Sequence, residues 1–84
     1  MDNTNKKNKE YNIIVNGRVK DWIHNEITYD EIVILALGLV ENTVFYSVTF
    51  KKGEEKKTEG IMVSGDKIKV KDGMIFNVTQ TNRS

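Results

Sequence analysis

The feature that most constrains the fold of this chain is a single well-marked helix signal near its middle. Thr28 is followed three residues later by Glu31, the spacing of a capping box in which each side chain bonds the other residue's backbone N–H. Gly38 is a natural C-terminal stop, because glycine accepts the left-handed backbone that ends many helices. We therefore predict a short helix over residues 29–37. Its expected apolar face consists of Ile32, Leu35, Ala36 and Leu39, widened by Val33, Leu37 and Val40.

A strand hairpin is predicted before the helix. Residues 11–15 are mostly β-branched or aromatic, and Asn16-Gly17 follows them directly. This dipeptide favours a two-residue hairpin turn, because both residues accept a positive φ. Residues 18–23 would form the returning strand. Its expected inward residues are Val19 and Ile23, with Trp22 on the opposite face or at the strand end.

Strand patterns also follow the helix. From residue 43 onward the side chains alternate between two faces, which predicts a strand whose inward residues are Val44, Tyr46, Val48 and Phe50. A charged loop over residues 51–59 precedes shorter strands at 60–63, 67–71 and 74–78, and Asp72-Gly73 is predicted to be a second hairpin turn. A hairpin, one helix and three or more further strands predict an α+β fold, in which one helix covers one twisted sheet.

The composition indicates a domain without chemistry of its own. Among 84 residues, 13 Lys and Arg stand against 12 Asp and Glu, and the net charge of +1 gives no electrostatic basis for binding nucleic acid or a membrane surface. There is no Cys and one histidine, His24, which argues against thiolate and multi-imidazole metal sites. We find no nucleophile, acid–base or phosphate-binding motif. We therefore expect a protein that is not an enzyme, with no catalytic residue, no metal and no cofactor.

The two ends of the chain differ from its middle. Residues 1–10 contain one apolar residue, which predicts a disordered N-terminal tail. The domain is predicted over residues 11–79, and residues 80–84 are expected to form a flexible polar tail. No stretch has the length and apolar character of a signal peptide or a membrane helix, so we expect a cytoplasmic protein without a membrane partner.

Two pairs of residues are candidates for a protein-docking surface. Trp22 and Phe45 are aromatic residues expected on the exposed face of the sheet, where such residues often mark binding surfaces. Ordinary packing at the sheet edge is the alternative. Lys67 and Lys69 belong to a row of lysines on one face of a predicted strand, where they would either protect an exposed edge or contribute to a binding surface.

The order of elements and several segments resemble a known family. A hairpin, a helix and returning strands is the β-grasp order of ubiquitin-like proteins. The segments IIVNGR at 13–18, ITYDEIV at 27–33, YSVTFKKG at 46–53, SGDKIKVKDGMIFNVT at 64–79 and TNRS at 81–84 are similar to those of the bacterial multiubiquitin family. KVKDGMIFNVT, at 69–79, is the most specific of them. The resemblance implies an α+β ubiquitin-like β-grasp fold, with a mixed sheet of four to five strands packed on one helix.

The resemblance also implies a function. Members of the family are ubiquitin-like modifiers, whose C-terminal carboxylate is adenylated by an activating enzyme and then transferred to target amines. The implied partners are an activating enzyme, a conjugating enzyme and a metal-dependent deconjugating peptidase, and the implied setting is bacterial protein conjugation in defence against phage. The conjugation tail would consist of Asn82, Arg83 and Ser84.

The carboxyl end departs from the ubiquitin pattern. Ubiquitin and its sulfur-carrier relatives end in Gly-Gly, which passes through narrow enzyme channels because it has no side chains. This sequence has no glycine after Gly73 and ends in Asn82-Arg83-Ser84. Three interpretations remain open at this point. Ser84 is the activated residue, the sequence is a shortened form, or the domain is an interaction module that is not conjugated.

Overall fold

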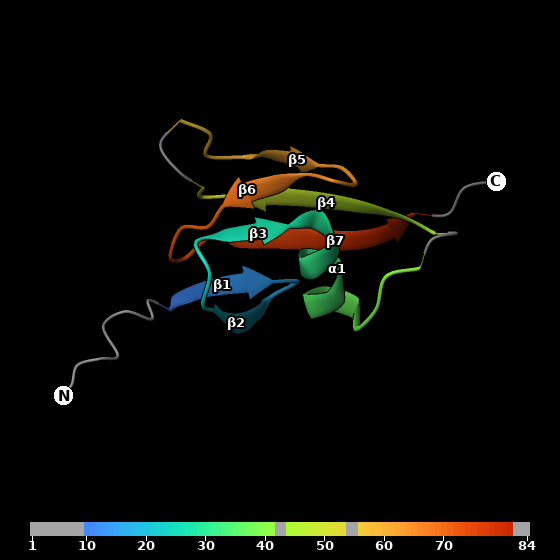
Figure 1. Ribbon diagram of the computed structural model, residues 1–84, viewed down its shortest axis with the longest axis horizontal. Coiled ribbons are helices and arrows are strands. Elements are labelled where there is room, and N and C mark those ends of the chain that lie inside the picture. Colours follow the sequence, from blue (N-terminus) through green and yellow to red (C-terminus); the bar gives the residue numbers. More distant parts are fainter. Residues whose placement is uncertain (1–9, 42–43, 54–55, 82–84) are drawn as a thin grey trace.

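The computed structural model describes residues 10–41, 44–53 and 56–81, and within these ranges it contains one helix and seven strands (Figure 1). In chain order the elements are β1 (Tyr11–Val15), β2 (Arg18–Trp22), β3 (Glu26–Thr28), α1 (Tyr29–Leu37), β4 (Phe45–Lys51), β5 (Gly60–Met62), β6 (Lys67–Lys69) and β7 (Ile75–Thr81). Five strands form one sheet in the order β2-β1-β7-β4-β5, and β3 pairs with β6 in a separate two-stranded ribbon.

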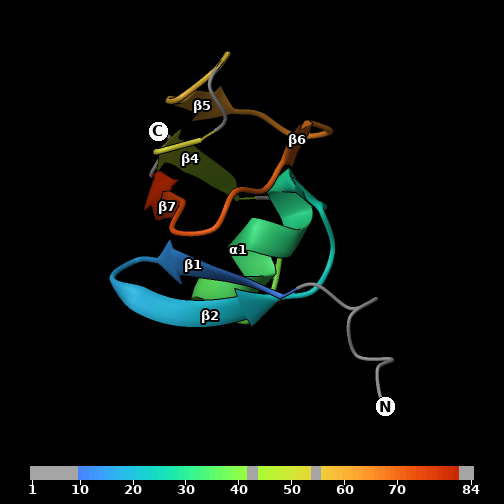
Figure 2. The ribbon, with the colours of Figure 1, turned by 90° about the vertical axis from the view of Figure 1, so that its left-hand side faces the viewer.

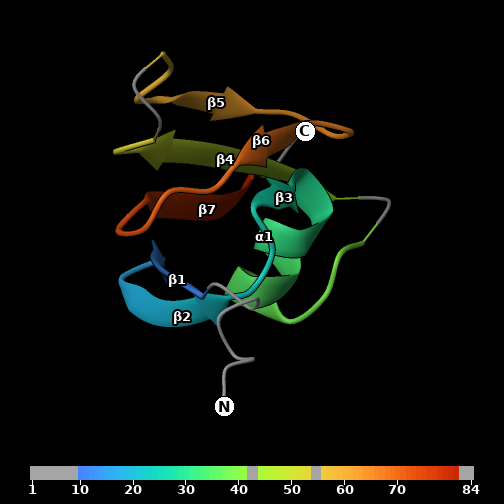
Figure 3. The ribbon, with the colours of Figure 1, turned by 60° about the vertical axis from the view of Figure 1, so that its left-hand side comes forward.

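The large sheet is mixed and has α1 across one face. β1 and β7 run parallel, whereas the other neighbours in this sheet are antiparallel. Figures 2 and 3 show α1 on the concave side of the sheet, with the β3–β6 ribbon beside it. The predicted α+β β-grasp architecture, a mixed sheet of four to five strands packed on one helix, is confirmed.

The core lies between the helix, the large sheet and the ribbon. Its fully buried side chains come from all three parts and include Ile13, Ile27, Ile32, Val33, Val48, Met62, Met74 and Phe76. Burial of these side chains is the main force that holds the helix and the ribbon against the sheet.

The helix forms as the sequence predicts. Thr28 Oγ1 accepts from the Glu31 N–H at 3.1 Å, Glu31 Oε1 accepts from the Thr28 N–H at 2.9 Å, and α1 spans Tyr29–Leu37. Gly38 ends it with φ 92°, and its N–H donates to the Ile34 carbonyl at 2.8 Å. The predicted apolar face is too wide, because Leu37 and Leu39 are 42% and 51% exposed.

The first hairpin forms as predicted, but its faces are reversed. A two-residue turn places Val15 opposite Arg18 and therefore Ile13 opposite Lys20. Directly opposed residues share a face, so β2 directs Lys20 and Trp22 toward the core. The prediction that Val19 and Ile23 face inward is wrong, since they are 68% and 58% exposed.

The second predicted hairpin does not exist. Asp72-Gly73 is a turn, but β6 on one side of it pairs with β3, while β7 on the other side lies between β1 and β4. The strand β3 was not predicted, because its three residues look like the entry to the helix. Their pairing partner, β6, is about forty residues further along the chain.

The last strand is longer than predicted. β7 runs to Thr81, with Thr79, Gln80 and Thr81 opposite Ser47, Tyr46 and Phe45 of β4. Residues 80 and 81, which we expected in a flexible tail, are therefore paired strand residues. The rest of that tail, residues 82–84, and residues 1–9 of the predicted N-terminal tail lie outside the described residues.

Candidate functional site

The end of β7 is the first part of the candidate site. β7 is paired with β4 along its whole length, from Ile75 opposite Lys51 to Thr81 opposite Phe45. The Thr81 hydroxyl also donates to the Phe45 carbonyl at 3.1 Å. The strand is therefore held in place up to its last described residue. The predicted conjugation tail, Asn82, Arg83 and Ser84, lies outside the described residues.

A hollow of about 210 Å³ lies beside this strand end, because Phe45, the partner of Thr81, forms part of its wall. The start of α1, the segment between α1 and β4, the first residues of β4 and the turn after β5 surround it. Its lining residues are Tyr29, Asp30, Val40, Glu41, Val44, Phe45, Tyr46 and Ser64. We call this the strand-end hollow.

Hydrogen bonds of two tyrosines fix the wall of the strand-end hollow. The Tyr29 hydroxyl donates to the Tyr46 carbonyl at 3.1 Å, and the Tyr46 hydroxyl accepts from the Glu41 N–H at 3.1 Å. These bonds connect α1 and the segment after it to β4. Each hydroxyl has a hydrogen-bond partner, so the two side chains that form this wall are held in place.

The strand-end hollow combines apolar walls with carboxylates. Phe45 and Val44 supply apolar surface, whereas Asp30 and Glu41 supply negative charge. Such a lining can hold a side chain with an apolar stem and a basic or hydrogen-bond-donating end. Sequence reasoning missed this site, since its residues come from separate segments. The single available signal was that an inward-facing tyrosine, Tyr46, needs a partner for its hydroxyl.

The four residues predicted to form a docking surface do not come together. Trp22 pairs with Tyr11 at the start of β1, whereas Phe45 pairs with Thr81 at the end of the parallel strand β7. The two aromatic residues thus lie at opposite ends of the sheet. They also lie on opposite faces, because Trp22 shares the face of Ile13 while Phe45 alternates with the core residues of β4.

Trp22 has a structural role in the connection between β2 and β3. Its indole Nε1 donates to the Glu26 carbonyl at 2.9 Å, and its ring meets the His24 ring edge-on at a centroid distance of 5.5 Å. The ring is half-buried against the core. The expectation that Trp22 lies on the exposed sheet face is wrong. Phe45, by contrast, is 60% exposed as expected.

Lys67 and Lys69 lie on β6 of the ribbon and not on the large sheet. Both are exposed, and the Lys67 ammonium is 3.5 Å from Glu26 Oε1 across the ribbon. An exposed ion pair of this kind contributes little to stability, typically about 0–1 kcal/mol. The two lysines therefore lie on the ribbon and not on the strand that carries Phe45, whereas Trp22 bonds to the ribbon at Glu26, the residue opposite Lys69.

The described part of the chain contains neither a group of metal-binding side chains nor a membrane-spanning helix. Across residues 10–41, 44–53 and 56–81, no three His, Cys, Asp or Glu side chains are grouped so that they could hold a metal ion. Within the same ranges no helix is long and apolar enough to cross a membrane.

Comparison with known proteins gives one result. Searches of curated proteins and of solved structures found no match. The multiubiquitin family model, however, matches residues 11–82, which include every strand and the helix. A match of this extent, on a domain with one helix across a mixed five-stranded sheet, shows that the chain belongs to the multiubiquitin family.

Proposed function

We propose that this domain is a ubiquitin-like protein modifier, whose C-terminal carboxylate is activated by a partner enzyme and joined to amines of target proteins. The observation that carries the proposal is the geometry of β7. A strand in the interior of the sheet is hydrogen-bonded as far as Thr81, so that whatever follows is presented from a fixed point. Membership of the multiubiquitin family supports the same role.

The proposed reaction assigns the chemistry to partners. A carboxylate is a poor electrophile, so an activating enzyme would transfer it to the α-phosphate of ATP with loss of pyrophosphate. A nucleophile of that enzyme would displace AMP, a conjugating enzyme would take over the acyl group, and a target amine would form the final amide. A deconjugating peptidase would hydrolyse that amide. We propose the bacterial cytoplasm as the location and defence against phage as the setting.

The strand-end hollow is our candidate surface for docking the activating enzyme. It adjoins the end of β7, so an enzyme bound there would have the following residues within reach of its active site. Its carboxylates, Asp30 and Glu41, complement a basic partner surface and would favour encounter with it.

The test is an activation assay with the activating enzyme encoded nearest to this protein. The protein, the enzyme and ATP are combined, and intact-mass spectrometry is used to look for the adenylate, the enzyme-linked form and higher-mass conjugates. Removal of residues 82–84 leaves β7 intact and should abolish all three. Removal of residues 1–9, which precede the family match, is the matched control and should leave them unchanged.

Docking is tested in the same assay. Glu41→Lys should lower the rate of adenylate formation at least tenfold, because the new ammonium cancels the negative charge that Asp30 leaves in the strand-end hollow. Glu59→Lys makes the same change in net charge at an exposed position that does not line this hollow, and it should change the rate less than twofold. Equal effects of the two variants would contradict docking at this site.

The second candidate function is an interaction module that binds a protein without being conjugated. The lining of the strand-end hollow favours this alternative, because apolar walls with two carboxylates can bind a partner without any reaction at the carboxyl end. Two results together would establish the interaction module in place of the modifier. The protein would keep its unmodified mass after incubation with active enzyme and ATP, and removal of residues 82–84 would leave activity in cells unchanged.

A further inference from the structure

We propose that the open edge of β6, together with the hollow next to it, binds an extended segment of a partner protein in which a large apolar residue lies between two acidic residues. This site is distinct from the end of β7. The proposal does not depend on conjugation, and it holds for a modifier and for an interaction module alike.

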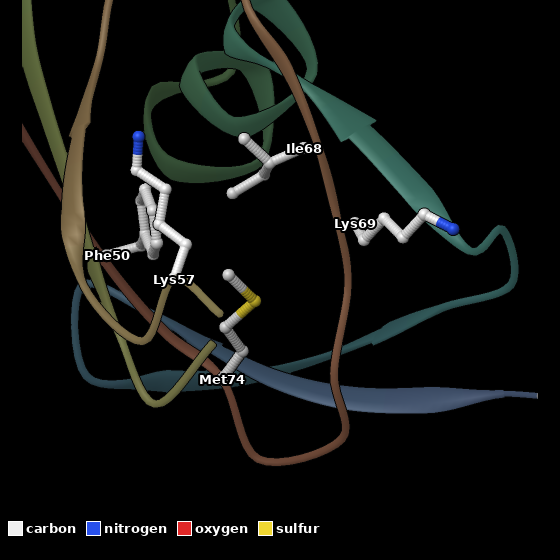
Figure 4. A pocket seen from close by; sticks show the side chains of 5 residues that line it. All are labelled: Phe50, Lys57, Ile68, Lys69 and Met74. Carbon is white, nitrogen blue, oxygen red and sulfur yellow. The ribbon is translucent and has the colours of Figure 1, made fainter. Parts of the chain in front are cut away.

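The hollow at this site has an apolar interior. It measures about 220 Å³ and is lined by Phe50, Lys57, Ile68, Lys69 and Met74 (Figure 4). Figure 4 shows the side chains of Phe50, Ile68 and Met74 pointing toward one another, with the stem of Lys57 beside Phe50. The side chain of Lys69 points away, so Lys69 borders the hollow with its main chain. We call this the ribbon hollow.

The size of the ribbon hollow limits what it can hold. Sites for drug-sized ligands and cofactors usually measure about 300–1,000 Å³, so this hollow suits one side chain of about the size of leucine. Two glycines pack closely against residues that line it. A Cβ at Gly60 would lie 3.1 Å from Phe50 Cζ, and a Cβ at Gly53 would lie 2.7 Å from the Lys57 carbonyl oxygen.

The main chain of β6 offers unpaired hydrogen-bonding groups beside the ribbon hollow. On the side of β3, the Tyr29 N–H donates to the Asp66 carbonyl at 3.0 Å and the Val70 N–H donates to the Asn25 carbonyl at 2.9 Å. Because main-chain groups alternate between the two sides of a strand, those of Lys67 and Lys69 point to the other side. Among the described residues no third strand pairs with β6 on that side.

A strand added to this edge would place its side chains in a defined order. Directly opposed residues share a face. The residue opposite Ile68 would therefore point inward, toward the ribbon hollow, while its two neighbours would lie opposite Lys67 and Lys69 on the outer face. This register predicts that the bound segment has the order acidic, apolar, acidic. The segment would add a strand to the exposed edge, as extended peptides do on other peptide-binding domains.

The charges at the edge favour an acidic partner. Glu26 lies 3.5 Å from the Lys67 ammonium, so one carboxylate of the chain is already at this surface. Within the described residues no carboxylate is within 4.0 Å of the ammonium of Lys57 or Lys69. Lysines on an open strand discourage pairing with neutral or basic strands. The same lysines would select a strand that carries carboxylates.

The position of this site leaves the end of β7 accessible. Met74 immediately precedes β7 and Thr81 ends it. Seven residues of strand at about 3.3 Å each separate these two positions by roughly 23 Å. A partner bound at the ribbon hollow would therefore not cover the point from which the carboxyl end is presented.

The test is a titration of the full-length, ¹⁵N-labelled protein with the capped peptide Thr-Val-Glu-Leu-Glu-Val-Thr, followed by NMR. We expect saturable shifts of the amide signals of Lys67, Lys69 and Gly60, and slower hydrogen exchange at the amides of Lys67 and Lys69. Exchange at these two amides reports the added strand directly, because their N–H groups point to the open edge.

Matched peptides and variants separate the contribution of the apolar side chain from that of the charges. Replacing the central leucine of the peptide by serine, or both glutamates by lysine, should weaken binding at least tenfold. Lys69→Glu in the protein should also weaken binding at least tenfold. Arg18→Glu makes the same change in net charge on β2 and should change binding less than twofold. Thermal unfolding of both variants confirms that each is folded.

Five outcomes would overturn the proposal. The first four are no saturable shift at millimolar peptide, shifts centred on another surface, equal binding of the serine peptide, and concentration-dependent dimerisation through β6, which would make a second copy the occupant. The fifth comes from a competition experiment. Octanoate is used as a competitor. Displacement of the peptide by octanoate at equal concentration would identify the ribbon hollow as a site for small anionic amphiphiles instead.

Discussion

Asn16-Gly17 and Asp72-Gly73 are similar turns that connect different kinds of strand pairs. Gly17 and Gly73 have φ angles of 81° and 87°, the left-handed backbone that glycine favours in turns. Asn16 also has a positive φ of 52°, as the predicted hairpin turn requires, whereas Asp72 does not. The first turn joins β1 to β2, which pair with each other. The second joins β6 of the ribbon to β7, which inserts between β1 and β4 of the large sheet.

The residues before the two glycines bond to distant parts of the chain. Asn16 Nδ2 donates to the Val78 carbonyl at 3.1 Å, and Asn16 Oδ1 accepts from the Val78 N–H at 2.7 Å. Asp72 Oδ1 accepts from the Asn12 N–H at 2.7 Å. Both turns thus attach β1 to the segment that contains β7. The comparison teaches that a turn dipeptide determines where the chain reverses, whereas the core determines which strands then pair.

The largest expected effect comes from a substitution that removes the core contact of β7 and so tests whether the core selects the position of this strand. Phe76 is fully buried and lies 6.4 Å from Phe50 between ring centroids. Phe76→Ala should lower the free energy of unfolding by about 3–5 kcal/mol, because it leaves a cavity in the core. Urea denaturation measures this. Asn77→Ala, at the exposed neighbouring position, is the control, and a loss below about 1 kcal/mol for Phe76→Ala would mean that the core does not select the position of β7.

A second substitution isolates the long-range role of the first turn. Asn16→Gly keeps the positive φ of the turn, which is 52° at Asn16, but removes both hydrogen bonds to Val78. It should cost about 2 kcal/mol, because the partly buried main-chain groups of Val78 lose their partners. Urea denaturation measures the loss of stability. Faster amide exchange at Val78 reports the loss of the acceptor for its N–H. If stability is unchanged, the turn acts through its backbone conformation alone.

A smaller effect is expected at the second turn. Asp72→Ala removes the acceptor for the Asn12 N–H at an exposed position and should cost about 0.5–1 kcal/mol. Asp72→Asn retains the oxygen and should recover most of this loss. Thermal or urea unfolding of the two variants distinguishes them. A larger loss for Asp72→Ala than for Asn16→Gly would reverse the order that we assign to the two turns.

The smallest effect is expected on the outer face of the first hairpin. Val19 is 68% exposed, so Val19→Ser should change the free energy of unfolding by less than about 0.5 kcal/mol. Its matched control is Val15→Ser in β1, which introduces the same hydroxyl at a buried position and should be clearly destabilising. A loss above about 2 kcal/mol for Val19→Ser would contradict the exposed position of Val19 and would mean that this side chain faces the core.

Much of the fold could be predicted because its signals are local. The capping box at Thr28 and Glu31 and the stop at Gly38 act within one helical turn, and α1 spans the predicted residues. The alternation in β4 predicted Val48 and Phe50 as core residues, and both are buried. The reversed face of β2 could also have been predicted, since a two-residue turn places Ile13 opposite Lys20, whereas apolar character alone favours Val19.

The candidate sites could not be predicted in the same way. The strand-end hollow takes Tyr29, Glu41 and Phe45 from different parts of the chain, and the ribbon hollow takes Phe50 from β4, Ile68 from β6 and Met74 from the segment before β7. Neither set has a spacing that marks it in the sequence. The predicted docking residues Trp22, Phe45, Lys67 and Lys69 were chosen by residue type, and the fold places Phe45 at the far end of the large sheet from Trp22 and both lysines on the ribbon.

The sequence by itself determined the helix with its caps, the left-handed backbone of Gly17 and Gly73 and the inward face of β4. These features depend on hydrogen bonds and backbone preferences within a few residues. Only the tertiary structure decided that β7 lies between β1 and β4, that β3 pairs with β6, and where the hollows form. These pairings close loops of about 24 to 61 residues, from Lys51–Ile75 to Ile14–Ile75. The entropy cost of closing such loops is offset by the burial of the whole core and not by any local signal.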